Sequence, residues 1–190
     1  LRCPLDGAPR KATSLMGEPR ARGRRRHLGL DLEAIGGEPV RSVADGTVIF
    51  AGFDRKGGKS MEVPPEDTRK VKASSMAAGG LFVMVRHDGG LVSAYMHLSK
   101  YVVRKGDVVP AGALIGHVGR TGMKESAAHL HFELRRDGGH LDPLPALRPY
   151  LFVPTDTWRG QRARWEKRRK GKKRREGKKR REGRAPPKAR

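Results

Sequence analysis

Apolar and polar residues alternate in short runs over residues 27–152, and glycine-rich turns separate these runs. A two-residue period is typical of strands with one buried face, and no part of the region keeps a period of 3.6 residues. Asp-Gly-Gly sequences starting at Asp88 and Asp137 lie between alternating runs, as hairpin turns do. The pattern therefore predicts an all-β domain, built as an antiparallel sheet, a sandwich or a small barrel.

Three segments lie outside this pattern. Residues 1–19 are rich in Pro, Gly and Arg and predict an irregular lead-in to a domain spanning residues 20–152. Segment 54–80 is polar and too long for an ordinary hairpin loop, which predicts an insertion loop within the domain. Residues 153–190 repeat the hexamer KKRREG and hold almost nothing apolar after Trp165, so they predict a linker and a disordered tail.

The tail dominates the charge of the chain. Residues 159–190 contain eighteen Lys or Arg against three Glu, a net charge of +15 within a total of +22. Such a run binds dense polyanions through counterion release. If the protein lies outside the cytoplasm, the expected polyanions are wall polymers or outer-membrane phosphates. Nucleic acid is the rival partner, and a merely solubilising tail needs no partner. Only Trp158 and Trp165 are available for stacking on bases, which disfavours sequence-specific recognition of nucleic acid.

Compartment signals are few. Cys3 is the single cysteine, so no internal disulfide can form. No apolar stretch approaches the ~20 residues of a membrane span, which predicts no transmembrane segment. No signal peptide is visible in this chain, which begins with Leu1.

The segment SAAHLHFEL, residues 126–134, holds two histidines one residue apart. On a strand His129, His131 and Glu133 share one face, and the leucines and phenylalanine between them form the apolar face. Two imidazoles on one face bind a cation, relay protons, or are simply surface polar groups.

A second candidate motif is His27-x-x-x-Asp31 within RHLGLDL. One nitrogen and one carboxylate oxygen suit Zn²⁺ when another protein ligand joins them. The alternating leucines predict a strand here, and a fully extended strand separates the two Cα atoms by roughly 13 Å, too far to share an ion. The chain must therefore bend between them, and Gly29 is the residue that permits it.

The segment SAYMHLS places Ser93, Tyr95 and His97 on one face of a strand by the same alternation. Two other histidines, His87 and His140, flank the Asp-Gly-Gly turns and are predicted to be exposed. His117 has no paired ligand nearby in the sequence and is given no role.

The motifs RHLGLDL, SAYMHLS and SAAHLHFEL, in this order and with VRSVADGTVIFAG between them, resemble the LytM/lysostaphin-type zinc metallopeptidases. The resemblance runs from about residue 20 to residue 151. It implies an antiparallel sheet with a groove holding one Zn²⁺ ion. It also implies an endopeptidase that hydrolyses peptide cross-links in bacterial peptidoglycan with a zinc-activated water, and hence an extracytoplasmic location in the periplasm, at the cell envelope or in the medium.

The resemblance also implies roles for individual residues. His27, Asp31 and His131 match the metal ligands, and His97 and His129 match the catalytic histidines. One of that pair exchanges a proton with the water or the leaving amine, and the other hydrogen-bonds the oxyanion; the motif leaves open which does which.

Two further residues have open roles. Tyr95 lines the groove, donates a hydrogen bond to the oxyanion, or merely packs in the core. Glu133 either holds His131 or is a plain surface glutamate, and the surface role is favoured.

Two rival functions of other classes are also compatible with this sequence. One is a non-catalytic wall-binding activator of another hydrolase, which needs no zinc. The other is a polyanion- or nucleic-acid-binding protein acting through its tail. A purely structural zinc site is disfavoured, because such sites are generally closed by a fourth protein ligand and Cys3 lies outside the motifs.

Overall fold

The computed structural model of the chain describes residues 1–20, 24–123 and 125–154. Leu1–Phe152 form one compact unit, and residues 153 and 154 lie outside it. The predicted disordered tail lies outside the described residues, apart from residues 153 and 154. None of the helices in the described part of the chain combines the length and apolar character that crossing a membrane requires.

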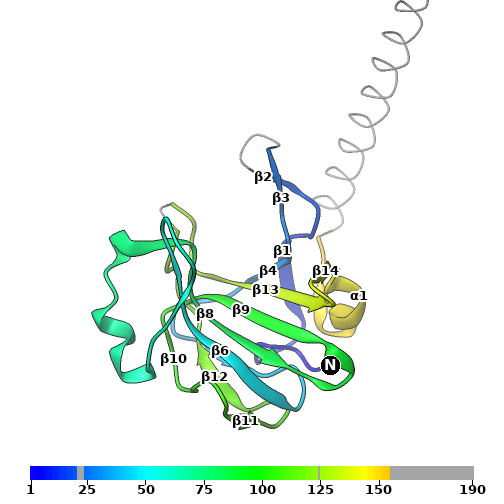
Figure 1. The fold of residues 1–190 in the computed structure, drawn as a ribbon. Coiled ribbons are helices and arrows are strands. Elements are labelled where there is room, and N and C mark those ends of the chain that lie inside the picture. Colours follow the sequence, from blue (N-terminus) through cyan, green and yellow to red (C-terminus); the bar gives the residue numbers. More distant parts are fainter. Residues whose placement is uncertain (21–23, 124, 155–190) are drawn as a thin grey trace, which may run out of the picture. The chain divides into compact units, whose positions relative to one another are not determined.

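The all-β prediction is confirmed (Figure 1). The main sheet has the strand order β11 (Val108–Val109), β6 (Gly46–Arg55), β8 (Met76–Arg86), β9 (Val92–Leu98), β13 (His129–Arg136), β4 (Leu30–Glu33), β1 (Arg10–Ser14) and β15 (Leu151–Phe152). Strands β7 (Met61–Glu62) and β14 (Gly139–Leu141) pair with β6 and β13. Its pairs are antiparallel except for β1 with β15.

Two smaller sheets and a few short helices complete the described fold. One sheet has the order β10 (Lys100–Tyr101), β12 (Leu114–His117) and β5 (Pro39–Arg41), and the other is the hairpin β2 (Pro19–Arg20) and β3 (Arg25–Arg26). The helices are η2 (Pro65–Lys70), η3 (Ala73–Ser75), η4 (Asp88–Gly90), α1 (Leu144–Leu147) and η5 (Arg148–Tyr150).

Both predicted hairpin turns are confirmed. Asp88–Gly90 joins β8 to β9, and Asp137 with Gly138 joins β13 to β14. Asp137 and Gly138 have φ angles of 50° and 76°. Positive φ at both central residues is the geometry that a tight antiparallel hairpin requires, which explains the Asp-Gly sequence.

Strand β13 lies between β9 and β4 and shows how one face of the sheet becomes the core. Phe132 pairs with Tyr95 on one side and with Leu30 on the other, and all three side chains are fully buried. The rings of Tyr95 and Phe132 pack with their centroids 5.3 Å apart. The preceding residue of β13, His131, faces the opposite way and pairs with Asp31 and Met96. The polar motif therefore lies on the face that turns away from this core.

The first 19 residues are less irregular than predicted. Strand β1 pairs with both β4 and β15, and Leu5 is buried and bridges to Val40. Sequence periodicity missed β1 because the strand is only five residues long and one of its two pairing partners is the distant β15.

The segment 54–80 is also structured. Strand β7 extends the edge of β6, and η2 and η3 lead into β8. Tyr101 donates a hydrogen bond to the Val63 carbonyl, and Arg104 and Lys105 form ion pairs with Glu66 and Glu62. These contacts with β10 and the residues that follow it hold the insertion in place.

Candidate metal centre

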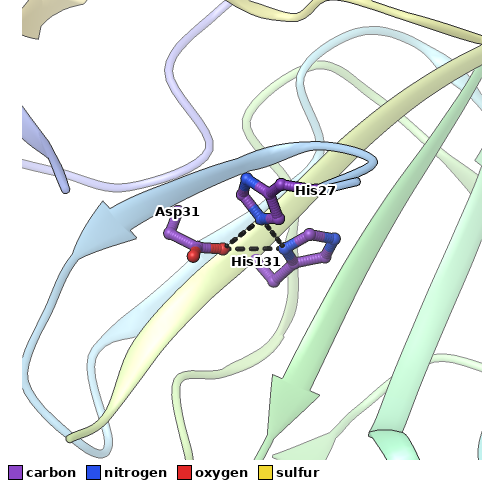
Figure 2. Close-up of side chains that lie close together, drawn as sticks. All are labelled: His27, Asp31 and His131. Carbon is purple, nitrogen blue, oxygen red and sulfur yellow. Dashed lines mark hydrogen bonds and ion pairs between the residues drawn. The ribbon is translucent and has the colours of Figure 1, made fainter. Parts of the chain in front are cut away.

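Three potential ligands converge on the polar face of the sheet (Figure 2). His27 Nε2 lies 2.9 Å from Asp31 Oδ1 and 2.9 Å from His131 Nδ1, and His131 Nδ1 lies 2.7 Å from Asp31 Oδ1. All three residues are buried. Two nitrogens and one carboxylate oxygen thus form a compact triangle of donor atoms.

The backbone explains how residues 27 and 31 meet. Strand β3 ends at Arg26 and β4 begins at Leu30, so the chain bends over residues 27–29 as the distance argument requires. Gly29 lies against β13 at this bend, and a Cβ on it would lie 2.3 Å from the Phe132 carbonyl oxygen. Glycine is therefore needed for close backbone approach, whereas the sequence suggested only that it permits a bend.

Each imidazole is held by its second nitrogen. His27 Nδ1 donates to the Leu15 carbonyl over 2.9 Å, and His131 Nε2 donates to Glu133 Oε1 over 3.1 Å. In a neutral imidazole this leaves His27 Nε2 and His131 Nδ1 as lone-pair donors facing the same point. Facing lone pairs beside a carboxylate require a positive charge between them, which fits a metal cation.

The electrostatics of the side chains support the same conclusion. Burial opposes charge on Asp31, but hydrogen bonds from His131 and His27 hold the pKa of its carboxyl well below its usual range. Burial also opposes charge on His131, but hydrogen bonds to Asp31 and Glu133 raise its pKa to about 9. A proton is thus retained where the donor atoms converge, so the cluster favours a cation at that point.

Glu133 is buried, with 3% of its surface exposed, so the prediction of a surface glutamate is wrong. Arg135 donates to Glu133 Oε2 through Nε at 2.8 Å and through Nη2 at 2.6 Å, and His140 Nε2 lies 3.2 Å from the same oxygen. Burial opposes ionisation, but hydrogen bonds from His131 and Arg135 lower the Glu133 pKa to about 2. The carboxylate is therefore ionised and able to orient His131.

Arg20 is a residue of the site that sequence reasoning missed. Its Nη2 donates to Asp31 Oδ2 over 2.6 Å and to Ser14 Oγ over 2.7 Å. Asp31 is thereby held by one oxygen while its other oxygen faces the two imidazoles. No spacing rule in the sequence connects Arg20 to Asp31; the signal was only the density of arginine just before His27.

His97 and His129 lie beside the triangle. The ring centroid of His97 is 5.1 Å from that of His129 and 5.7 Å from that of His131. His129 Nε2 lies 3.7 Å from Asp31 Oδ1. His97 Nδ1 donates to the Thr121 carbonyl, and His129 Nδ1 to the Ala127 carbonyl, so each presents Nε2 as the free ring atom.

His97 reaches this place through a bulge in β9. The pairing of β8 with β9 shifts by one residue between Leu81/Leu98 and Val83/Tyr95, and His97 has a φ of 63°. The extra residue turns His97 to the face of His131, whereas regular alternation would have kept it with Tyr95. The prediction that Ser93, Tyr95 and His97 share one polar face is therefore wrong.

Tyr95 packs in the core and does not line a groove. Its side chain is fully buried, and its hydroxyl accepts hydrogen bonds from the Val43 N–H and the Ser93 hydroxyl. Burial raises the Tyr95 pKa to about 12. Of the roles that the sequence left open for Tyr95, packing in the core is the one that the structure supports.

The other histidines lie apart from the triangle. His87 was predicted to be exposed but is buried, with Nδ1 bonded to the Asp45 carbonyl and Nε2 to Ser93 Oγ. His140 is only partly exposed and contacts Glu133. His117 has a buried Nδ1 with no partner among the described residues.

Residues 25–143 match Peptidase family M23, and the chain belongs to this family. The resemblance to LytM/lysostaphin-type peptidases is thus confirmed. The DD-carboxypeptidase/endopeptidase Mpg of Neisseria meningitidis is 36% identical over 125 residues, which cover 66% of this chain. The chain spans only 24% of that relative's length.

Two solved structures share the fold. The catalytic domain of the antimicrobial peptidase lysostaphin from Staphylococcus simulans has a TM-score of 0.57 and 28% identity, covering 74% of this chain and 92% of that one. A zinc containing peptidase from Vibrio cholerae has a TM-score of 0.57 and 27% identity, covering 73% and 37% of the two chains.

Proposed function

We propose that this protein is a zinc-dependent endopeptidase that hydrolyses peptide cross-links in bacterial peptidoglycan. One observation carries the proposal: two imidazole nitrogens and a carboxylate oxygen converge within 2.9 Å of one another, while each imidazole is anchored through its other nitrogen. An N,N,O donor set of two imidazoles and a carboxylate is typical of catalytic zinc, which keeps a position open for water or substrate.

In this proposal His27, Asp31 and His131 hold the zinc ion. Zinc at such a site supplies Lewis acidity and lowers the pKa of water from ~15.7 toward ~7. Arg20 and Glu133 keep Asp31 and His131 in their ligating orientations. Hydrogen-bonded partners of this kind preserve the tautomer and the ring plane of a histidine ligand.

Two further histidines, His97 and His129, handle protons and developing charge in this proposal. Burial and the charges of His131 and His129 lower the His97 pKa to about 4, so His97 is a neutral imidazole at neutral pH. With Nδ1–H bound to Thr121, its Nε2 is able to accept a proton. His129 also presents Nε2, because its Nδ1–H is bound to the Ala127 carbonyl. One of them exchanges a proton with the water or the leaving amine, and the other hydrogen-bonds the oxyanion.

The substrate class follows from the relatives. The meningococcal relative is a DD-carboxypeptidase/endopeptidase, and lysostaphin is an antimicrobial peptidase. We extend the peptidase activity to this chain and place its substrate in the bacterial wall, which requires an extracytoplasmic location. The basic segment 159–190 then serves to retain the enzyme on anionic wall polymers.

The test is mass spectrometry of soluble fragments released from purified peptidoglycan by the zinc-loaded protein. His131→Ala is the inactive comparison, and His117→Ala is the matched control because His117 lies outside the site. Peptides with new amino termini are expected from the wild type and from His117→Ala but not from His131→Ala. Their masses identify the bond that is cut.

The same experiment distinguishes the hydrolase from its rival, a non-catalytic activator of another hydrolase. If the wild type binds zinc in a 1:1 ratio and several wall chemotypes yield no fragments, catalysis is refuted. A protein that neither binds zinc nor releases fragments, yet stimulates another wall hydrolase, would be the non-catalytic activator.

A further inference from the structure

The cationic hairpin β2–β3 comes immediately before His27, a proposed metal ligand, in the sequence. Strands β2 and β3 belong to a stretch in which arginine occurs at positions 20, 22, 24, 25 and 26. Figure 1 shows the hairpin projecting from the body of the sheet. Its last strand runs straight into His27, so the position of the hairpin is tied to that of a proposed ligand.

The pairing of the hairpin determines which arginines face the site. Arg20 pairs with Arg25 and Pro19 with Arg26, and the His27 N–H continues the ladder by donating to the Glu18 carbonyl over 2.8 Å. Paired residues share a face, and residues two apart along a strand do too. Arg25 therefore shares the face of Arg20 and His27, whereas Arg26 points to the opposite face.

Arg20 proves that this face is turned toward the metal centre, because its Nη2 reaches Asp31 Oδ2 at 2.6 Å. Both of its hydrogen bonds use Nη2, and the side chain is 43% exposed. Arg20 Nε and Nη1, and the whole guanidinium of the exposed Arg25, have no partner among residues 1–20, 24–123 and 125–154.

Such a pair is unfavourable without a ligand. Like charges directly opposite each other on two strands destabilise their pairing. The nearest carboxylate on the hairpin, Glu18, is already used by the Ser14 hydroxyl and the Leu15 N–H. An anion from outside the chain would offset the repulsion between Arg20 and Arg25.

We propose that Arg25, together with the free edge of Arg20, forms a subsite for a free carboxylate of the substrate peptide. The guanidinium fork matches a carboxylate in geometry and charge, and such charge-assisted bonds are among the strongest in proteins. Because Arg20 also holds Asp31, a carboxylate bound here is positioned relative to the metal centre. This inference rests on the proposed function and specifies that the substrate peptide carries a free carboxylate.

The test compares Arg25→Gln with Arg26→Gln in the whole 190-residue chain. Both variants remove one charge from the same hairpin, so nonspecific attraction changes equally. The probe is a soluble cross-linked stem-peptide dimer from purified peptidoglycan, used with its carboxylates free or converted to carboxamides. For the free acid, Arg25→Gln is expected to raise KM by about tenfold, the size of one charge-assisted hydrogen bond, and to leave kcat within twofold. The carboxamide and Arg26→Gln are expected to show no such change.

Equilibrium binding of the same two peptides to the same whole chain after chelator treatment separates this inference from the proposed function. If Arg25→Gln weakens binding of the free-acid peptide but not of the carboxamide, the subsite is supported. This holds even if the zinc-loaded protein cleaves neither peptide, and that absence of cleavage would refute the hydrolase. Cleavage with equal KM for free acid and carboxamide overturns the subsite and leaves the hydrolase standing. Equal effects of Arg25→Gln and Arg26→Gln also overturn it, because they indicate attraction without a defined site.

Discussion

Two buried clusters in this sheet satisfy the ring nitrogens of their histidines in opposite ways. His87 binds the Asp45 carbonyl through Nδ1 and Ser93 Oγ through Nε2, and Ser93 continues to the Tyr95 hydroxyl. At the metal centre His27 and His131 use one nitrogen each for a protein acceptor and turn the other toward each other.

The difference shows which histidine nitrogens are free to bind a metal ion or a proton. In the His87 cluster every ring nitrogen has its own partner, so the cluster is closed and serves to tie the β8–β9 turn to the segment before β6. At the metal centre the convergent atoms satisfy each other only when a proton or a metal ion lies between them. A buried histidine therefore indicates a functional site only when one of its nitrogens lacks a dedicated partner.

Removing one histidine from each cluster is the strongest way to break the comparison. His131→Ala is expected to reduce zinc content to background and to abolish hydrolysis, because two ligands hold zinc poorly. His87→Ala is expected to retain zinc and activity while lowering the free energy of unfolding by about 1–3 kcal/mol, since it leaves buried partners unsatisfied. Metal analysis and urea denaturation measure both. Loss of zinc from His87→Ala would show that the two clusters are not independent.

The next effect concerns His97, which the bulge in β9 turns to the polar face. His97→Ala is expected to reduce kcat by roughly 10²–10⁴-fold, the range for a general acid–base group, while zinc content stays at one ion per chain. The pair of measurements distinguishes a proton-handling residue from a ligand. Zinc loss in this variant would contradict the assignment.

The closed cluster predicts a pH effect of its own. Burial raises the Tyr95 pKa to about 12 from 10.0. Between these values the unfolded chain has released the proton and the folded chain retains it, so stability falls as pH rises from about 10 to 12. The loss is roughly 2–3 kcal/mol.

Urea denaturation of the wild type and Tyr95→Phe from pH 9 to pH 12 measures this slope. The variant is expected to lose less stability over the range, although Tyr101, whose pKa burial also raises to about 12, still contributes. Identical slopes in the two proteins would contradict the argument.

The smallest expected effect lies at the edge of the metal centre. Glu133→Ala is expected to weaken zinc binding by about 10–100-fold, because His131 loses the acceptor that sets its tautomer. Glu133→Gln retains a carbonyl acceptor for His131 Nε2 and is expected to fall between this variant and the wild type. Competition with a chromogenic chelator measures the affinities. An unchanged affinity in Glu133→Ala would mean that the backbone alone orients His131.

Part of the site could be predicted without coordinates. The alternation in residues 126–134 correctly placed His129, His131 and Glu133 on one face, since that depends only on the two-residue period of a strand. The distance argument for His27 and Asp31 correctly required a bend, because it rests on the length of an extended chain.

Other features lay beyond local rules. The bulge that separates His97 from Tyr95 depends on the registers that β9 makes with β8 and β13, and these strands come from distant parts of the chain. The burial of Glu133 and its contact with Arg135 likewise depend on which strands cover that face.

The sequence by itself determined the residue types, the β class and the pairs that a single strand must place side by side, because short-range backbone geometry dictates them. The resemblance of the motifs to a family indicated that His27 and Asp31 meet His131, but local backbone geometry does not dictate that meeting. The tertiary structure alone decided that Arg20 reaches Asp31 and that Tyr95 is core. These outcomes arise from strand order and register, which are set by packing the whole sheet and not by any one segment.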